Sequence, residues 1–331
     1  MKKIINDPDL AVQDMLEGFV AAYPNKVKLL PNTNVIVRSD APVTNKVGIV
    51  SGGGSGHEPA HAGYVGEGML DAAVSGEVFT SPTPDQIFEA IKAVDAGSGV
   101  LLIIKNYTGD VMNFDMATEL AEMEGINVQQ VVVNDDVAIR NSSFTTGRRG
   151  IAGTVFVHKI AGAKAAQRAS LEEVKKVAEK VIANVRSIGM AITPCTVPAA
   201  GTPSFVLEEN EMEIGIGIHG EPGIERKVIT TADEIATELT QKVLDDMNLE
   251  IGAEVAVMVN GLGATPEMEL YIVNKKVNEL LKKKGIKIYD TFVGEFLTSL
   301  EMAGCSVTLL KVDQELKNLL EVKSLAPAFR R

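Results

Sequence analysis

The chain has 331 residues, of which 45% are hydrophobic and 23% charged, and a globular protein of this length is expected to form about two domains. Asp and Glu number 44 against 32 Lys and Arg, and the net charge of −12 argues against nucleic acid or an anionic membrane as a partner. No targeting segment or membrane-length apolar run is visible, and Cys195 and Cys305 lack metal-ligand spacing, so we expect a soluble cytoplasmic protein with no metal site.

Strand-like and helical patterns alternate along the first half of the chain. A helix is expected over residues 9–23, and strands over residues 47–50, 71–76, 99–104 and 128–133. Further helices are expected to start near Pro59, after residues 80–85 and over residues 113–124. This alternation predicts an α/β fold with a mostly parallel or mixed sheet flanked by helices, in which ligands bind at the carboxyl ends of the strands.

A glycine-rich stretch, GGGSG over residues 52–56, follows the strand at residues 47–50. Glycine allows backbone N–H groups to converge on one point, and a helix start just beyond would add positive charge, so the stretch predicts a loop for a phosphate or a small polyhydroxylated molecule. His57 would lie at the rim of this loop, and His61 is either a second rim group or a structural residue. The P-loop ending is missing, so ATP is not implied.

Four polar side chains follow strand-like runs in this half: His57, Ser81, Lys105 and Asp110. Groups at equivalent strand ends can converge on one crevice although they are distant in sequence. A carboxylate after Gly109 is commonly a turn former, but in such a crevice Asp110 can accept a proton from an alcohol or hold the hydroxyl for attack.

The middle of the chain contains a polar loop over residues 141–150 with Arg148 and Arg149, which either bind an anion or a partner protein or are simply solvated. Helices are expected over residues 154–166 and 171–187, with His158 as a packing or surface residue. We place a domain boundary near residues 187–189, which gives an N-terminal domain over 1–187 and a C-terminal domain over 188–331. Residues 323–331 either stay with the C-terminal domain or fold back on the N-terminal one.

The second half predicts another α/β unit. Helices are expected over residues 232–247 and 267–284, and strands over 190–192, 211–219, 255–259, 286–289 and 306–312. The GxGxxG pattern at residues 215–220 is not followed by a helix, which argues against a dinucleotide site and hence against a dehydrogenase.

His219 ends the alternating run and precedes a turn, where Glu221 is near enough to orient a ring nitrogen. A neutral imidazole with one free nitrogen is a competent nucleophile toward a carbonyl carbon. The alternative is a strand-end histidine without a role.

Five stretches carry a family resemblance: residues 52–63, 76–85, 105–110, 215–223 and 301–308. They resemble the dihydroxyacetone kinase K family, and the similarity covers essentially the whole chain. It implies two α/β domains, a homodimer and the phosphorylation of dihydroxyacetone. It also implies that His219 binds the substrate carbonyl as a hemiaminal through Nε2, and that His57 and Asp110 transfer the proton of the hydroxyl that receives the phosphoryl group. The substrate-binding residues that it implies are Gly54, Ser55, Gly56, His57, Lys105 and Asp110, with Ser81 close by.

The resemblance also bears on cofactors and partners. In this chain, the K region is not followed by enough residues for a nucleotide-binding helical domain. This favours the bacterial system in which the kinase is split into separate subunits. There, a separate L subunit carries ADP with magnesium and is rephosphorylated by a protein of the phosphotransferase system, so no cofactor is expected in this chain. The alternative is a relative that binds dihydroxyacetone without phosphorylating it and acts as coactivator of a transcription factor. The presence of His57 and Asp110 beside His219 favours the enzyme.

Overall fold

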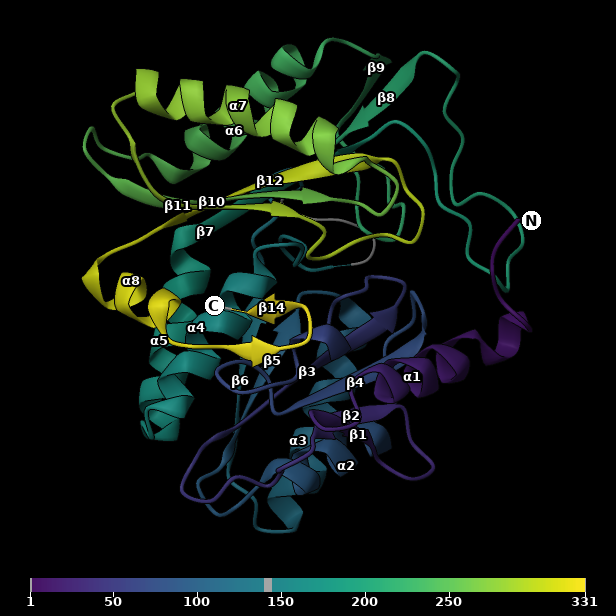
Figure 1. Cartoon of the computed structure of the whole chain (residues 1–331), viewed down its shortest axis with the longest axis vertical. Coiled ribbons are helices and arrows are strands. Elements are labelled where there is room, and N and C mark those ends of the chain that lie inside the picture. The colour runs from purple at the N-terminus through teal and green to yellow at the C-terminus, as the bar shows by residue number, and fades with distance from the viewer. Residues whose placement is uncertain (1, 140–144, 331) are drawn as a thin grey trace.

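The computed structural model describes residues 2–139 and 145–330, and these build five layers (Figure 1). Helices α2 (Pro84–Val94) and α3 (Thr108–Met123) cover one face of a first sheet. Helices α4 (Thr154–Ala166) and α5 (Leu171–Asn184) lie between this sheet and a second one. The outer layer on the second sheet is formed by α6 (Ala232–Met247) and α7 (Glu267–Lys283).

The first sheet has six strands in the order β1-β2-β4-β3-β5-β6. Its neighbours β4, β3, β5 and β6 are parallel, whereas β1 and β2 add antiparallel strands at one edge. The short helix η1 (Pro8–Leu10) and helix α1 (Ala11–Ala22) precede the first strand in the chain. The strands are β1 (Val27–Leu29), β2 (Val35–Arg38), β3 (Gly48–Ser55), β4 (Ala72–Val78), β5 (Val100–Lys105) and β6 (Val128–Val133).

The second sheet also has six strands, in the order β11-β10-β12-β7-β8-β9, and only its β10–β11 pair is parallel. Two mixed sheets flanked by helices confirm the predicted α/β class. The strands are β7 (Val185–Ala191), β8 (Glu211–Ile214), β9 (Glu225–Val228), β10 (Glu254–Gly261), β11 (Lys287–Gly294) and β12 (Gly304–Lys311).

Local sequence explains where several helices begin. Ser170 and Glu173 form a capping box at α5, and Thr231 and Glu234 form another at α6, so the first N–H groups of both helices have side-chain acceptors. Helix α6 occupies the predicted residues 232–247, and Asn248 ends it in a left-handed conformation (φ 48°).

The last described segment packs against the first-sheet side of the molecule (Figure 1). It consists of α8 (Gln314–Glu321), β13 (Leu325–Ala326) and β14 (Phe329–Arg330). The buried Lys159 on α4 donates to the carbonyl oxygens of Leu319 (3.0 Å) and Val322 (2.6 Å). One apolar core therefore runs from the first sheet through α4 and α5 to the inner face of the second sheet and the returning segment, and the division at residue 187 stays a prediction.

Several local predictions are wrong. Residues 52–54 form the end of strand β3 and not a loop, and the segment after Pro59 contains only the short helix η2 (Ala62–Tyr64). Helix α3 begins at Thr108, which places Asp110 in its first turn. Strand β8 stops at Ile214, because Gly215 turns the chain with a φ of 75°, so His219 lies in a loop and not at a strand end.

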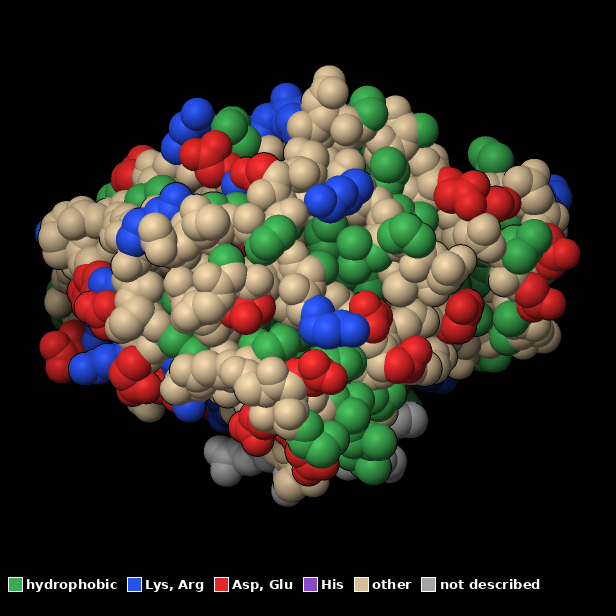
Figure 2. Space-filling model, turned by 90° about the horizontal axis from the view of Figure 1, so that it is seen from below, with side chains coloured by type: hydrophobic (Ala, Val, Ile, Leu, Met, Phe, Trp, Pro, Cys, Tyr) green, Lys and Arg blue, Asp and Glu red, His purple; other side chains and the backbone are tan. Residues whose placement is uncertain are grey.

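The face seen from below mixes acidic, basic and hydrophobic side chains, with no histidine in view (Figure 2). This fits the burial of His57, His61 and His158, which are at most 5% exposed. Within residues 2–139 and 145–330, none of the helices combines the length and the apolar character needed to cross a membrane.

Candidate functional site

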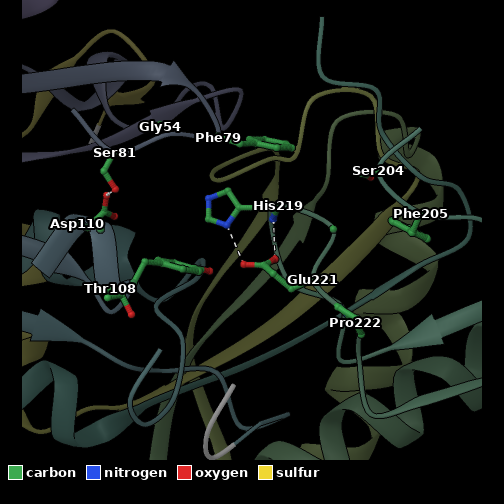
Figure 3. A pocket seen from close by; sticks show the side chains of 13 residues that line it. Gly54, Phe79, Ser81, Thr108, Asp110, Ser204, Phe205, His219, Glu221 and Pro222 are labelled. Carbon is green, nitrogen blue, oxygen red and sulfur yellow. Dashed lines mark hydrogen bonds and ion pairs between the residues drawn. The ribbon is translucent and has the colours of Figure 1, made fainter. Parts of the chain in front are cut away.

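A cavity of about 650 Å³ opens between the two halves of the molecule (Figure 3). The first-sheet side contributes segments that follow the parallel strands, and the other side contributes the loop after β8 together with residues 204 and 205. Gly54, Asp110 and His219, predicted from the sequence to be site residues, all line it, and so does Ser81. Of the four strand-end side chains predicted to converge, Ser81 and Asp110 line this cavity, whereas Lys105 lies behind Asp110 and His57 lies behind His219.

The glycines of β3 make room for the polar groups beside them. A Cβ at Gly53 would lie 2.3 Å from Lys105 Nζ, and a Cβ at Gly54 would lie 2.6 Å from the backbone nitrogen of Thr80. These glycines thus serve close approach within a sheet and not an anion-binding turn. The Ser55 hydroxyl donates to the Gly76 carbonyl (2.7 Å), and the Gly56 N–H donates to Glu58 (3.1 Å). Substrate contacts by Ser55 and Gly56 stay predictions.

Asp110 lies at the start of α3 and receives two donors. Ser81 Oγ donates to Oδ1, and Lys105 Nζ lies 3.3 Å from Oδ2. The Lys105 side chain is 1% exposed and that of Asp110 is 5% exposed, so this ion pair is shielded from water. A carboxylate held in this way at the cavity wall can accept a hydrogen bond from a substrate hydroxyl and then its proton.

His57 is fully buried directly after β3. Its Nδ1 lies 2.7 Å from the Thr298 carbonyl oxygen, which can only accept, so we assign the proton to Nδ1 and the lone pair to Nε2. Nε2 has no hydrogen-bond partner among the described residues. Burial first, with smaller contributions from the neighbouring His219 and Lys105, lowers the pKa of His57 well below its usual value, so the ring is a neutral acceptor.

His219 is oriented by Glu221, as the sequence suggested. Its Nδ1 lies 2.8 Å from Glu221 Oε1, and its backbone N–H donates to Oε2 at 2.9 Å. Burial would raise the pKa of Glu221, but His219 and Arg149 together lower it to about 2. An ionised carboxylate only accepts hydrogen bonds, so Nδ1 carries the proton. Figure 3 shows the other ring nitrogen directed into the cavity, toward Ser81 and Asp110.

Aromatic rings enclose the His219 imidazole. Its centroid lies 4.7 Å from Tyr107, 5.2 Å from Phe79 and 4.9 Å from His57, all edge-on. Phe79 also stacks on His57 at 5.0 Å. Sequence reasoning did not identify Phe79 or Tyr107 as site residues. Their place beside Ser81 and Lys105, in two stretches already singled out, was the available signal.

The two adjacent arginines are structural. Arg148 pairs with Asp246, and the buried Arg149 pairs with Asp136 at 2.6 Å while it donates to the Gly215 carbonyl at 2.7 Å. Both guanidinium groups are paired with carboxylates of this chain, which corrects the anion-binding alternative, and the buried Arg149 is not solvated either. Arg149 instead holds the loop that carries His219 through its bond to Gly215, and contact with a partner protein stays a prediction. The start of the predicted polar loop, residues 141–144, lies outside the described residues.

The α/β fold and this site define a member of a known class: residues 17–328 match the Dak1 domain, and the chain belongs to this family. It is 57% identical over 315 residues, 95% of both chains, to the dihydroxyacetone-binding subunit DhaK of PTS-dependent dihydroxyacetone kinase 1 of Listeria innocua. It is 54% identical over 328 residues, 98% of both chains, to the corresponding DhaK subunit of Lactococcus lactis. These similarities confirm the family predicted from the motifs.

Solved structures share the fold. The dihydroxyacetone kinase from C. freundii in complex with AMP-PNP and Mg²⁺ superposes with a TM-score of 0.92 at 34% identity, and the match covers 99% of this chain and 61% of that one. The dihydroxyacetone kinase operon co-activator DhaQ superposes with a TM-score of 0.89 at 39% identity, covering 95% of this chain and 97% of that one. Enzyme and co-activator therefore share this architecture.

Proposed function

We propose that this chain is the dihydroxyacetone-binding subunit of a dihydroxyacetone kinase that depends on the phosphotransferase system. Its identity to two subunits of that name exceeds its identity to the co-activator, at 57% and 54% against 39%. The observation that carries the proposal is the His219–Glu221 pair, which leaves one ring nitrogen with a lone pair facing the cavity, opposite Asp110.

The first step in this proposal is capture of the ketone. His219 Nε2 forms a bond to the carbonyl carbon, and the π electron pair moves to the oxygen, which takes a proton from solvent in the open cavity. The positive charge left on the imidazole faces the Glu221 carboxylate, 2.8 Å from Nδ1. The resulting hemiaminal fixes a small molecule in one orientation, which removes most of the entropy cost of the next step. It also selects ketones and aldehydes over glycerol, which has no carbonyl.

The second step is phosphoryl transfer to a substrate hydroxyl. Asp110 and His57 Nε2 are the acceptors assigned to the hydroxyl proton, while Gly54 lines the cavity and Lys105 lies behind Asp110, 3.3 Å from Oδ2, as a proposed substrate-binding residue. Protein groups contribute mainly alignment and charge control to such a reaction. A three-carbon ketone fills only part of a cavity of about 650 Å³, so a donor has room to enter from the mouth.

The phosphoryl donor is proposed to be a separate L subunit that carries ADP with magnesium and is recharged by a phosphotransferase-system protein. The exposed side chains of Met112 and Met116, 59% and 53% exposed, lie on α3 after Asp110 and offer an apolar contact on this helix. A homodimer in the cytoplasm is part of the same proposal, and light scattering of the purified chain tests the dimer.

The test is formation of dihydroxyacetone phosphate by this chain with its L partner and donor protein, with intact-mass analysis for the adduct. Wild type should turn over and gain the mass of one dihydroxyacetone, and His219→Ala should do neither. Loss should be on the order of 10⁴-fold or more, because orientation by the covalent bond disappears. Adduct formation without turnover would favour a co-activator, and turnover with ATP and without the L subunit would contradict the split system.

A further inference from the structure

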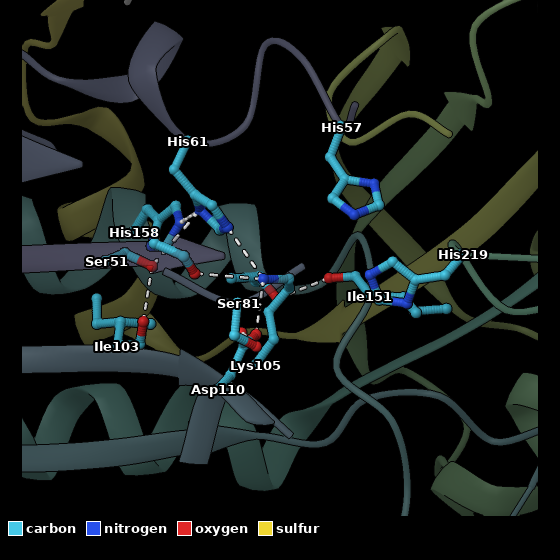
Figure 4. A network of polar contacts seen from close by, with 12 residues as sticks. Ser51, His57, His61, Ser81, Ile103, Lys105, Asp110, Ile151, His158 and His219 are labelled. Atoms are coloured by element: carbon cyan, nitrogen blue, oxygen red, sulfur yellow. Dashed lines mark hydrogen bonds and ion pairs between the residues drawn. The ribbon is translucent and has the colours of Figure 1, made fainter. Parts of the chain in front are cut away.

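A second polar cluster lies beneath the cavity wall and is not used by the capture step (Figure 4). It joins Lys105 at the end of β5 to His61, in the turn after β3, and to His158 on α4. Lys105, His61 and His158 are 1%, 5% and 0% exposed. The two histidines are 97 residues apart in sequence, and their ring nitrogens, His61 Nδ1 and His158 Nε2, lie 2.9 Å apart.

The hydrogen bonds of this cluster have one direction. A lysine ammonium has three N–H donors and no acceptor. Lys105 Nζ has three acceptors within reach: the Gly52 carbonyl at 3.3 Å, Asp110 Oδ2 at 3.3 Å and His61 Nε2 at 3.2 Å. His61 Nε2 must therefore accept, so its proton is on Nδ1 and is donated to His158 Nε2. His158 in turn carries its own proton on Nδ1, which is buried and has no hydrogen-bond partner among the described residues.

We propose that His61 and His158 are positioning residues that hold the Lys105 ammonium on Asp110 through this directional chain. The inference rests on the proposed function, because its consequence for turnover depends on Asp110 acting at the substrate hydroxyl. His61 supplies the third acceptor of the ammonium, and His158 fixes the tautomer in which His61 can accept. Without this chain Lys105 has a buried, unmatched donor and loses its fixed place between β3 and α3.

The electrostatics of the cluster agree with neutral rings. Burial first, and then the charge of Lys105, lower the pKa of His61 well below its usual value, and the same two causes lower the pKa of His158 to about 3. A protonated His61 would direct an N–H at the Lys105 ammonium, so only the neutral form fits. The charged or titratable groups that face the two rings are Lys105, His57 and Tyr64, whose ring centroid lies 6.1 Å from that of His158, besides each other.

The first test reads the tautomers without any assay of activity. The chain has only four histidines, so ¹⁵N–¹H correlation of the ring nitrogens in the full-length protein gives four spin systems, each assignable by one substitution. We expect His61 and His158 both to show the Nδ1–H tautomer at neutral pH. Lys105→Met should release His61 from this single form. An Nε2–H tautomer at His61 in wild type would overturn the proposal, whether or not the protein is a kinase.

The second test separates positioning from binding. His61→Leu removes the acceptor, and kcat for dihydroxyacetone should fall on the order of 10- to 100-fold with little change in KM and with the adduct mass intact, because His219 is untouched. His61→Gln, which restores an acceptor oxygen, and His158→Gln, which keeps an acceptor for His61, should each lose much less. Equal losses in the leucine and glutamine variants, or loss of the adduct, would contradict a positioning role.

Discussion

Both sides of the cavity contain a histidine and a carboxylate, but they differ in how deeply these groups are buried and in how far apart they are in sequence. On the first-sheet side, Asp110, Lys105 and His61 form a buried network in which the hydrogen bonds have assigned directions. On the other side, His219 and Glu221 are two residues apart in one loop, and the His219 side chain is 20% exposed. The buried side is suited to holding a charge arrangement constant during phosphoryl transfer. The exposed, local pair is suited to forming and releasing a bond.

This contrast predicts that the two carboxylates fail in different ways, and the larger effect belongs to Asp110. Asp110→Asn removes the proton acceptor and leaves Lys105 without its counter-charge, so kcat should fall about 10³-fold. The adduct on His219 should still form, as shown by intact mass. Asp115→Asn, five residues along the same helix and bonded to Gln130 at 2.6 Å, is the matched control and should retain activity. Loss of the adduct in Asp110→Asn would contradict the separation of the two sides.

Glu221→Gln should weaken binding more than it slows transfer. The neutral amide can still accept from His219 Nδ1, but a hydrogen bond to a charged acceptor is worth about 1.4 kcal/mol more, which corresponds to about tenfold in affinity. Titration calorimetry with dihydroxyacetone measures the change. Glu225→Gln, on the exposed strand β9, is the control. If kcat fell and the dissociation constant stayed the same, Glu221 would belong functionally with Asp110.

The last prediction concerns stability on the buried side. The pKa of His158 is lowered to about 3, so the unfolded chain takes up its proton near its ordinary value of 6.5 before the folded chain does. The contribution of the neutral ring is present above that value and is lost as the pH falls toward the folded pKa. Wild type should therefore lose about 1.4 kcal/mol more than His158→Gln between about pH 7.5 and about pH 5.5.

Urea unfolding of both proteins at the two pH values checks this difference. Lys164→Gln, on the same helix, leaves His158 in place, so its loss should equal that of wild type. Parallel losses in wild type and His158→Gln would mean that His158 takes up its proton in the folded protein and would place it in contact with water.

The sequence was most informative where the deciding contacts are local. Helix α6 has its capping box and apolar spacing within residues 231–247, and Glu221 is two positions from the ring that it orients. The polar groups at the parallel strand ends were predicted to converge, because sheet geometry alone brings them together. The family resemblance then supplied the proposed roles of His57, Asp110 and His219.

The failures share a non-local cause. The run of glycines was predicted to be a loop, but Gly53 lies in a strand and is needed there because the side chain of Lys105 packs against it. The sequence suggested that Arg149 is solvated or binds a partner, but in the structure it pairs with Asp136 and donates to the Gly215 carbonyl. His158 was expected to be a packing or surface residue, but it contacts His61, which is 97 residues away in sequence. Periodicity and spacing contain no information about such partners, because each is fixed by tertiary packing.

The returning segment has a consequence for synthesis on the ribosome. Leu316, Ala326 and Phe329 belong to the same apolar core as Val12 and Ile49. Contacts of such large sequence separation cannot form until almost all 331 residues have been translated. The half of the molecule that is translated first therefore completes its core last. While the other half is being translated, the first half remains incompletely packed and depends on protection from aggregation.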